Sequence, residues 1–145
     1  MMRKICFLFV LLLLTGFNVF AQESGNITVS TTGFRNDKGQ ALVAIFNSEL
    51  GFPSDMNHAL IAKTAEIENG MSTVAFTGVP AGKYAISAIH DEDRDMHFDT
   101  NWIFLPAEGW GTSNNTQGFF GPGNYRDSRF ILDSPDATIN IIIHY

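Results

Sequence analysis

Apolar and polar residues alternate along most of the chain in short segments that turn-forming residues separate. In the segment 27–34, Ile27 and Val29 fall on one side and polar residues on the other, which is the period of two expected of a β-strand. The other segments that we expect to form strands are 41–47, 71–79, 83–90, 126–133 and 137–145.

Two of these segments add detail. Segment 41–47 is apolar on both sides, which favours a strand in the middle of a sheet. Segment 59–67 has an ambiguous period, so it is either a weak strand or a short helix. About seven short strands with no convincing long helix predict an all-β domain built as a two-sheet antiparallel sandwich.

The first 21 residues have the pattern of a secretory signal peptide. Arg3 and Lys4 precede an apolar run, and cleavage is expected between Ala21 and Gln22. The apolar run is too short to span a membrane, so we expect no membrane span. The single cysteine, Cys6, lies inside this segment and away from the cleavage site of a lipoprotein. We therefore expect a periplasmic or secreted domain, residues 22–145, that folds without disulfides.

Charge narrows the choice of partners. Of the nine basic residues, Arg3 and Lys4 belong to the predicted signal peptide, which leaves seven against fifteen acidic residues. This excess of negative charge disfavours nucleic acid and anionic membranes as partners, because both attract Lys and Arg. It is compatible with cation binding.

The segment "HDEDRDMHFDTN" (90–101) concentrates acidic residues. Its spacing suits Ca²⁺, which takes several oxygen ligands from carboxylates and backbone carbonyls. The loop is not an EF-hand, because Met96 stands where the turn glycine would be and Trp102 where the bidentate Glu would be. The candidate ligands are Asp91, Asp93, Asp95, Asp99, the backbone carbonyl of His97, and Glu108 as a late addition.

Two alternatives to calcium stay open for this loop. Asp residues commonly bond their own backbone in solvated turns without any ion. His90 and His97 also bracket the loop, and imidazole suits a transition metal.

The segments "VPAGKYAISAIHDEDRDMHFDTN" and "LPAEGWGTSNN" resemble the bacterial family known as domain of unknown function 2141. The resemblance covers roughly residues 26–145. It implies an exported immunoglobulin-like or prealbumin-like sandwich and no particular activity. One position departs from the family, which tends to have Gly or Asn where this chain has Met96. Met takes a positive φ less readily than Gly, so the departure questions how tight the turn is.

The segment 91–125 reads as a long loop that carries both tryptophans and several other aromatic residues. One interpretation is a recognition surface for a carbohydrate or an envelope protein, with Trp102, Trp110, Asn114 and Asn115 as candidate ligand-binding residues. The other is a cluster of aromatic side chains that plugs the open end of the sandwich.

No catalytic motif stands out. The chain has no Gly-x-Ser-x-Gly elbow and no glycine-rich phosphate loop after a strand. The function we predict is a non-catalytic exported module that binds Ca²⁺ at residues 91–99 and recognises a ligand or envelope partner at that end. The alternatives are a small metal-dependent hydrolase that uses the same carboxylates and a purely structural envelope module.

Overall fold

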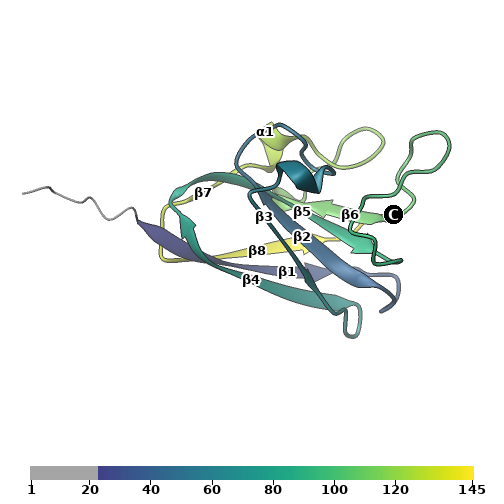
Figure 1. Cartoon of the computed structure of the whole chain (residues 1–145), viewed down its shortest axis with the longest axis horizontal. Coiled ribbons are helices and arrows are strands. Elements are labelled where there is room, and N and C mark those ends of the chain that lie inside the picture. Colours follow the sequence, from purple (N-terminus) through teal and green to yellow (C-terminus); the bar gives the residue numbers. More distant parts are fainter. Residues whose placement is uncertain (1–22) are drawn as a thin grey trace, which may run out of the picture.

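The computed structural model describes residues 23–145, so the predicted signal peptide lies outside the described residues. These residues form a two-layer β-sandwich (Figure 1). One sheet has the strand order β4–β1–β8, and the other has the order β3–β2–β5–β6 with β7 paired to β5. The strands are β1 (Ser24–Thr32), β2 (Gln40–Phe46), β3 (Ile61–Ala65), β4 (Met71–Pro80), β5 (Gly82–Asp91), β6 (Gly109–Thr112), β7 (Phe130–Leu132) and β8 (Asp136–Ile142).

This architecture confirms the all-β sandwich, with eight described strands instead of about seven. Helical segments in the described chain are limited to η1 (Met56–His58), η2 (Ser113–Asn115) and α1 (Tyr125–Ser128). None of the described helices has the length and apolar character needed to cross a membrane. Neighbouring strands pair antiparallel, except that β8 runs parallel to β1. The parallel pair arises because the chain crosses from β7 in one sheet to β8 in the other.

The space between the two sheets holds the main core. Ile27 and Val29 of β1 and Phe76 of β4 face Val43 of β2 and Ile86 of β5, and all five side chains are fully buried. Full burial of such a side chain contributes roughly 1.5–3 kcal/mol. The alternating pattern of the sequence therefore identified the inner face correctly.

The second sheet is buried on its outer face as well. Leu42, Phe46 and Ile89 point away from the main core and are nevertheless inaccessible to water. Phe52, from the segment after β2, packs edge-on against Phe46 at 5.3 Å between ring centroids. Phe98, from the segment after β5, lies near Ile89 on the same face. The prediction of a central strand at 41–47 is confirmed, because β2 pairs with β3 on one side and with β5 on the other.

Three segments differ from their expected form or settle an open choice. Segment 59–67 contains the strand β3 and not a helix. Segment 126–133 is not one strand: Asn124 accepts a hydrogen bond from the Asp127 N–H at 2.9 Å and caps the helical turn α1, after which only the short β7 remains. The expected long loop 91–125 is interrupted by β6, which pairs with β5.

Candidate functional site

The acidic loop leaves the sandwich at the end of β5, where Asp91 is fully buried. Gln40 Nε2 donates to Asp91 Oδ2 at 2.7 Å. The backbone N–H groups of Asp95 and Met96 donate to the same carboxylate, each at 3.1 Å. Asp91 therefore folds the loop back onto the end of its own strand.

Glu108, immediately before β6, holds the other side of the loop. Its carboxylate is buried and accepts the N–H of Glu92 at 2.9 Å and the N–H of Asp99 at 3.2 Å. Burial raises the pKa of Glu108, the two backbone hydrogen bonds lower it, and the nearby charges of Asp99 and Asp91 raise it further. The net effect is a raised pKa, so this carboxylate carries its charge at a cost.

The folded loop brings five of the predicted ligands into two overlapping groups. Carboxylate oxygens of Asp91, Asp93 and Asp95 lie within 4.8 Å of one another, and so do those of Asp93, Asp99 and Glu108. Asp93 belongs to both groups. Loss of solvent raises the pKa of Asp93, and the charges of Asp95, Asp99 and Asp91 act in the same direction. Crowded carboxylates of this kind could hold a metal ion.

The two histidines near the loop are placed differently. His97 is exposed, its backbone N–H donates to Asp95 Oδ1 at 2.7 Å, and its ring Nδ1 lies 2.8 Å from the Asp95 carbonyl oxygen. Its ring belongs to neither carboxylate group. His90 is fully buried, with Tyr145 Oη and the Lys38 carbonyl each 2.7 Å from one ring nitrogen. Both ring nitrogens of His90 are thus engaged, so the structure does not bring the two imidazoles together as a metal pair.

The turn inside the loop is tight although it has no glycine. Arg94 and Met96 adopt positive φ values of 64° and 65°. The Arg94 guanidinium donates to both carboxylate oxygens of Glu66, at 3.0 and 2.8 Å, and to the Gly39 carbonyl at 2.7 Å. Met96, which stands where the family tends to have Gly or Asn, therefore adopts the positive φ of a tight turn. This conformation is strained for a residue other than glycine.

A polar network that the sequence did not reveal lies behind the loop. The Arg35 N–H donates to Tyr145 Oη at 2.9 Å, and this hydroxyl also contacts His90. The Arg35 guanidinium forms an ion pair with Glu92 and lies 4.7 Å from the centroid of the Tyr145 ring. Residues 35 and 145 are too far apart in sequence for spacing to have predicted their contact.

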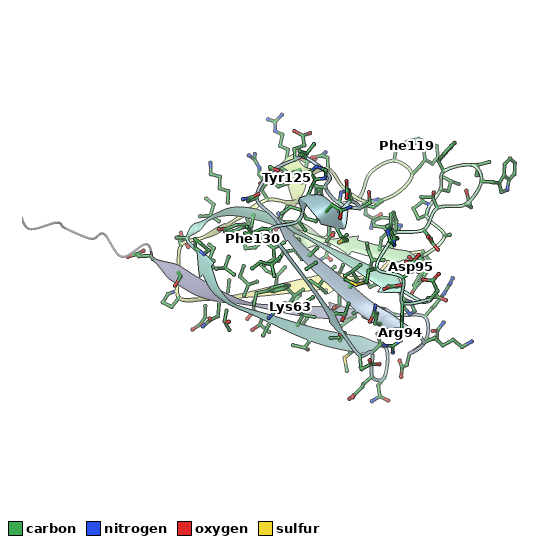
Figure 2. All side chains as sticks on the ribbon, viewed as in Figure 1. Lys63, Arg94, Asp95, Phe119, Tyr125 and Phe130 are labelled. Atoms are coloured by element: carbon green, nitrogen blue, oxygen red, sulfur yellow. The ribbon has the colours of Figure 1, made fainter. Side chains whose placement is uncertain are left out.

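Exposed aromatic side chains gather at the same end of the molecule. They sit on two turns, 101–105 and 117–122, whose hairpin-like shapes are closed by backbone hydrogen bonds. Both turns project from the end of the sandwich where Phe119 and Asp95 are labelled (Figures 1 and 2). The exposed fractions are 90% for Trp102, 87% for Phe104, 92% for Phe119 and 72% for Phe120. We call these four residues the aromatic tips.

A surface cavity of about 310 Å³ lies at the base of the aromatic tips. Its walls combine apolar and polar groups from both turns and from the C-terminus. They include Leu105, Pro106, Trp110, Gln117, Phe119 and Tyr145.

The four predicted ligand-binding residues are two tryptophans, which differ in burial, and two asparagines, which bond the backbone. Trp102 is exposed, whereas Trp110 in β6 is only 8% exposed and contributes one wall of the cavity. Asn114 Nδ2 donates to the carbonyls of Asp127 and Arg129, at 3.0 and 2.9 Å. Asn115 accepts the Ile142 N–H at 2.8 Å and so ties η2 to β8. The two asparagines are exposed, but their side chains bond the backbone and hold the fold together. Phe104, Phe119 and Phe120, which the sequence analysis did not single out, are exposed beside Trp102.

Fold and site together define a small all-β sandwich with a carboxylate cluster and an exposed aromatic surface at one end. The family model described as "Uncharacterized protein conserved in bacteria (DUF2141)" matches residues 29–140. The chain belongs to this family, which confirms the resemblance found in its sequence. No curated protein and no solved structure matches this chain.

Proposed function

We propose that this chain is an exported, non-catalytic recognition module that binds Ca²⁺ at the acidic loop and contacts a ligand or envelope partner through the aromatic tips. The observation that carries the proposal is the position of Asp93, whose carboxylate belongs to both carboxylate groups. One ion beside Asp93 would be within reach of carboxylates from both sides of the loop.

Calcium fits this set better than other common ions. It accepts six to eight oxygen ligands in flexible geometry, whereas Mg²⁺ requires a nearly ideal octahedron. Zinc sites generally use Cys or His, whereas both carboxylate groups consist of Asp and Glu alone. Asp93, Asp95 and Asp99 are exposed, so their carboxylates remain accessible to an ion that arrives from solvent.

The proposed ion site is joined to the aromatic tips through Asp99. The Asp99 carbonyl accepts the Ala107 N–H at 2.9 Å, and Thr100 pairs with Pro106 at the base of the turn that carries Trp102. An ion bound by Asp99 and Glu108 would fix this base. Cation binding and recognition would then be coupled by the ordering of one turn.

The aromatic tips supply the recognition surface in this proposal. Monomeric soluble proteins rarely leave several large aromatic side chains together in water without a partner. Aromatic faces contribute large contact areas at low entropic cost. A sugar ring or an apolar patch on an envelope protein would cover them.

The melting temperature tests the cation site directly. We expect millimolar Ca²⁺ to raise it by on the order of 5–10 °C relative to chelator, with smaller effects of Mg²⁺ and Zn²⁺. Asp93→Asn should remove the effect of Ca²⁺. Asp133→Asn, an equal change of charge at an exposed position outside the loop, should keep it. No shift with Ca²⁺ in the parent protein would reject the site.

The structural envelope module is the second candidate, and a specific observation favours it. Asp91 and Glu108 already accept backbone N–H groups, so the loop has an internal framework without an ion. The same contacts weaken the hydrolase alternative, because the two buried carboxylates serve the backbone. A melting temperature that no metal changes, with full folding in chelator, would favour the structural module.

A further inference from the structure

A group of basic side chains lies apart from the acidic loop. Nine Lys and Arg residues occur in the sequence, and seven remain in the part that the structure describes. Three of these seven, Lys83, Arg126 and Arg129, line one surface cavity of about 260 Å³ together with Phe130 and Ile131. Figure 2 labels Phe130 well away from Asp95, in the part of the molecule where α1 and β7 lie (Figure 1).

The fold explains why these side chains converge. Lys83 of β5 stands directly opposite Ile131 of β7 in the antiparallel ladder, so both extend from the same side of the sheet. Arg126 lies in α1 and Arg129 caps its end. The short turn therefore brings both arginines to the cavity, which they line together with Lys83.

The three cations have no ion-pair partner among the described residues. Among residues 23–145, the ion pairs that involve Arg or Lys join Arg35 to Glu92 and Arg94 to Glu66. Asp127, the nearest acid in sequence, accepts a hydrogen bond from Asn124 Nδ2 at 2.8 Å. The cavity therefore concentrates positive charge on an otherwise acidic protein.

Arg129 is held in a definite orientation. Its Nε donates to the Arg126 carbonyl at 3.3 Å, and its guanidinium carbon lies 6.0 Å from the centroid of the Tyr125 ring. Both contacts leave the two terminal NH₂ groups free to donate. A guanidinium presented in this way matches two oxygens of a phosphate group.

We infer that the cavity formed by Lys83, Arg126 and Arg129 binds a phosphate group. Two guanidinium groups and one ammonium suit the three oxygens and double charge of a phosphate better than a single carboxylate. Ile131 and Phe130 provide an apolar wall for the remainder of the ligand. The source of the phosphate is either a soluble phosphorylated molecule or a lipid headgroup. This inference does not depend on the calcium site.

The first test is an NMR titration with inorganic phosphate at constant ionic strength, with acetate as the comparison anion. We expect phosphate, and not acetate, to shift the backbone amides of residues 82–84 and 125–131. The affinity should fall as salt rises, because exposed charges are screened. Equal shifts with acetate, or none with phosphate, would overturn the inference.

Variants assign the binding to the three side chains. Arg129→Gln and Lys83→Gln should each weaken phosphate binding by about fivefold or more, since each removes a charge-assisted hydrogen bond. Lys38→Gln makes the same change of charge at an exposed position outside the cavity and should leave binding unchanged. Phosphate binding that survives both cavity variants would contradict the assignment. All three positions are exposed, so the variants should fold, which circular dichroism can verify.

Sedimentation with lipid vesicles distinguishes the two sources. Vesicles that contain phosphatidic acid, whose headgroup is a phosphate monoester, should bind and sediment the parent protein, and not Arg129→Gln, if the ligand is a headgroup. Binding of inorganic phosphate without retention on these vesicles identifies a soluble phosphorylated ligand. Absence of binding to inorganic phosphate rejects the inference, with or without sedimentation on vesicles and whatever the result with Ca²⁺.

Discussion

The segment "EGWGTSN" shows how single residues position the candidate site. Glu108 anchors both ends of the acidic loop. A Cβ on Gly109 or Gly111 would lie 2.5 Å from atoms of the C-terminal segment, so only glycine lets β6 approach the end of β8 this closely. Ser113 Oγ accepts the Ile86 N–H at 2.9 Å and fixes η2 against β5. The residues that made the family recognisable in the sequence therefore serve mainly to join β6 to its neighbours.

Gly111→Ala should destabilise the protein by about 1–3 kcal/mol, the usual cost of forcing a group into a packed site. The new Cβ would meet the Ile142 carbonyl oxygen at 2.5 Å, and backbone atoms cannot rotate away. Gly121→Ala is the control, because its Cβ would make only an ordinary contact of 3.4 Å with Pro106. Urea unfolding measures both. Equal stability of the two variants would show that β6 and β8 tolerate more separation than the structure indicates.

Met96→Gly should stabilise the protein by roughly 0.5–1 kcal/mol, because relief of the strain at positive φ exceeds the larger conformational entropy that glycine loses on folding. Met96 has a φ of 65°, and its side chain is 47% exposed, so little packing is lost. Met71→Gly is the matched control: Met71 is 53% exposed but lies in β4, where glycine costs roughly 0.5–1 kcal/mol. Thermal unfolding in chelator should move the two variants in opposite directions. A loss of stability in Met96→Gly would mean that this turn is not strained.

At the scale of elements, β6 decides which parts of the segment 91–125 are core and which are surface. The strand pairs with β5 on one side, and Trp110 N–H donates to the His144 carbonyl at 2.9 Å on the other. It therefore links the two sheets and buries one tryptophan, while the flanking turns remain outside. The aromatic residues of this segment therefore divide by burial: Trp110 packs within the fold, as the plug interpretation expects, whereas the aromatic tips are exposed and form the surface that we propose for recognition.

The two tryptophans offer a direct test of this division. Trp110→Ser should cost about 3–5 kcal/mol, as expected for truncation of a large buried side chain. Trp102→Ser should change stability by no more than about 0.5 kcal/mol, because its side chain is almost entirely in water. Unfolding followed by circular dichroism separates the two outcomes. A large loss of stability in Trp102→Ser would place this residue in a packed environment and remove it from the proposed recognition surface.

At the scale of the whole molecule, the two sheets differ in how many of their faces are buried. The sheet β3–β2–β5–β6 is covered on both faces, and the segments that follow its strands carry the carboxylates and the aromatic tips. The basic cavity is formed by residues of β5, α1 and β7 and by Arg129 between them. The sheet β4–β1–β8 supplies the inner wall of the core. The carboxylate groups and the basic cavity are therefore formed by different elements, and the two binding sites that we propose have opposite charge.

The charge distribution predicts how stability depends on pH. The raised pKa of Glu108 means that the folded protein in chelator is favoured by protonation of this group. This contribution is fully present below the ordinary pKa of 4.5 and is lost as pH rises through the raised pKa. In chelator, the parent protein should therefore lose stability relative to Glu108→Gln as pH rises through that window.

Calcium should reverse this trend, because a bound cation favours the ionised carboxylate. The stabilisation by Ca²⁺ should consequently shrink as the pH falls through the raised pKa values of Glu108 and Asp93. Melting temperatures in buffers from acidic to neutral pH, with and without Ca²⁺, measure the effect. A calcium effect that is equal at all pH values would exclude these carboxylates as ligands.

Much of the fold could be predicted because local patterns report burial. The alternation in β1 and β4 follows from one face that packs on the core and one that meets water. The segment 126–133 was misjudged because the cap by Asn124 and the contacts of η2 outweigh its strand-like composition. For the candidate site, the carboxylates lay close enough in sequence to be grouped by spacing, and Glu108 could be added only as a guess from composition.

The sequence by itself determined the sandwich, its inner core and the concentration of carboxylates, because each depends on residues that are neighbours along the chain or on burial of one face. Only the tertiary structure decided that Glu108 closes the acidic loop, that Trp110 is buried while Trp102 is exposed, and that three cations meet beside β7. These outcomes depend on which strands pair and which segments cross between sheets. Such choices are set by packing of the whole chain and leave no periodic signal in the sequence.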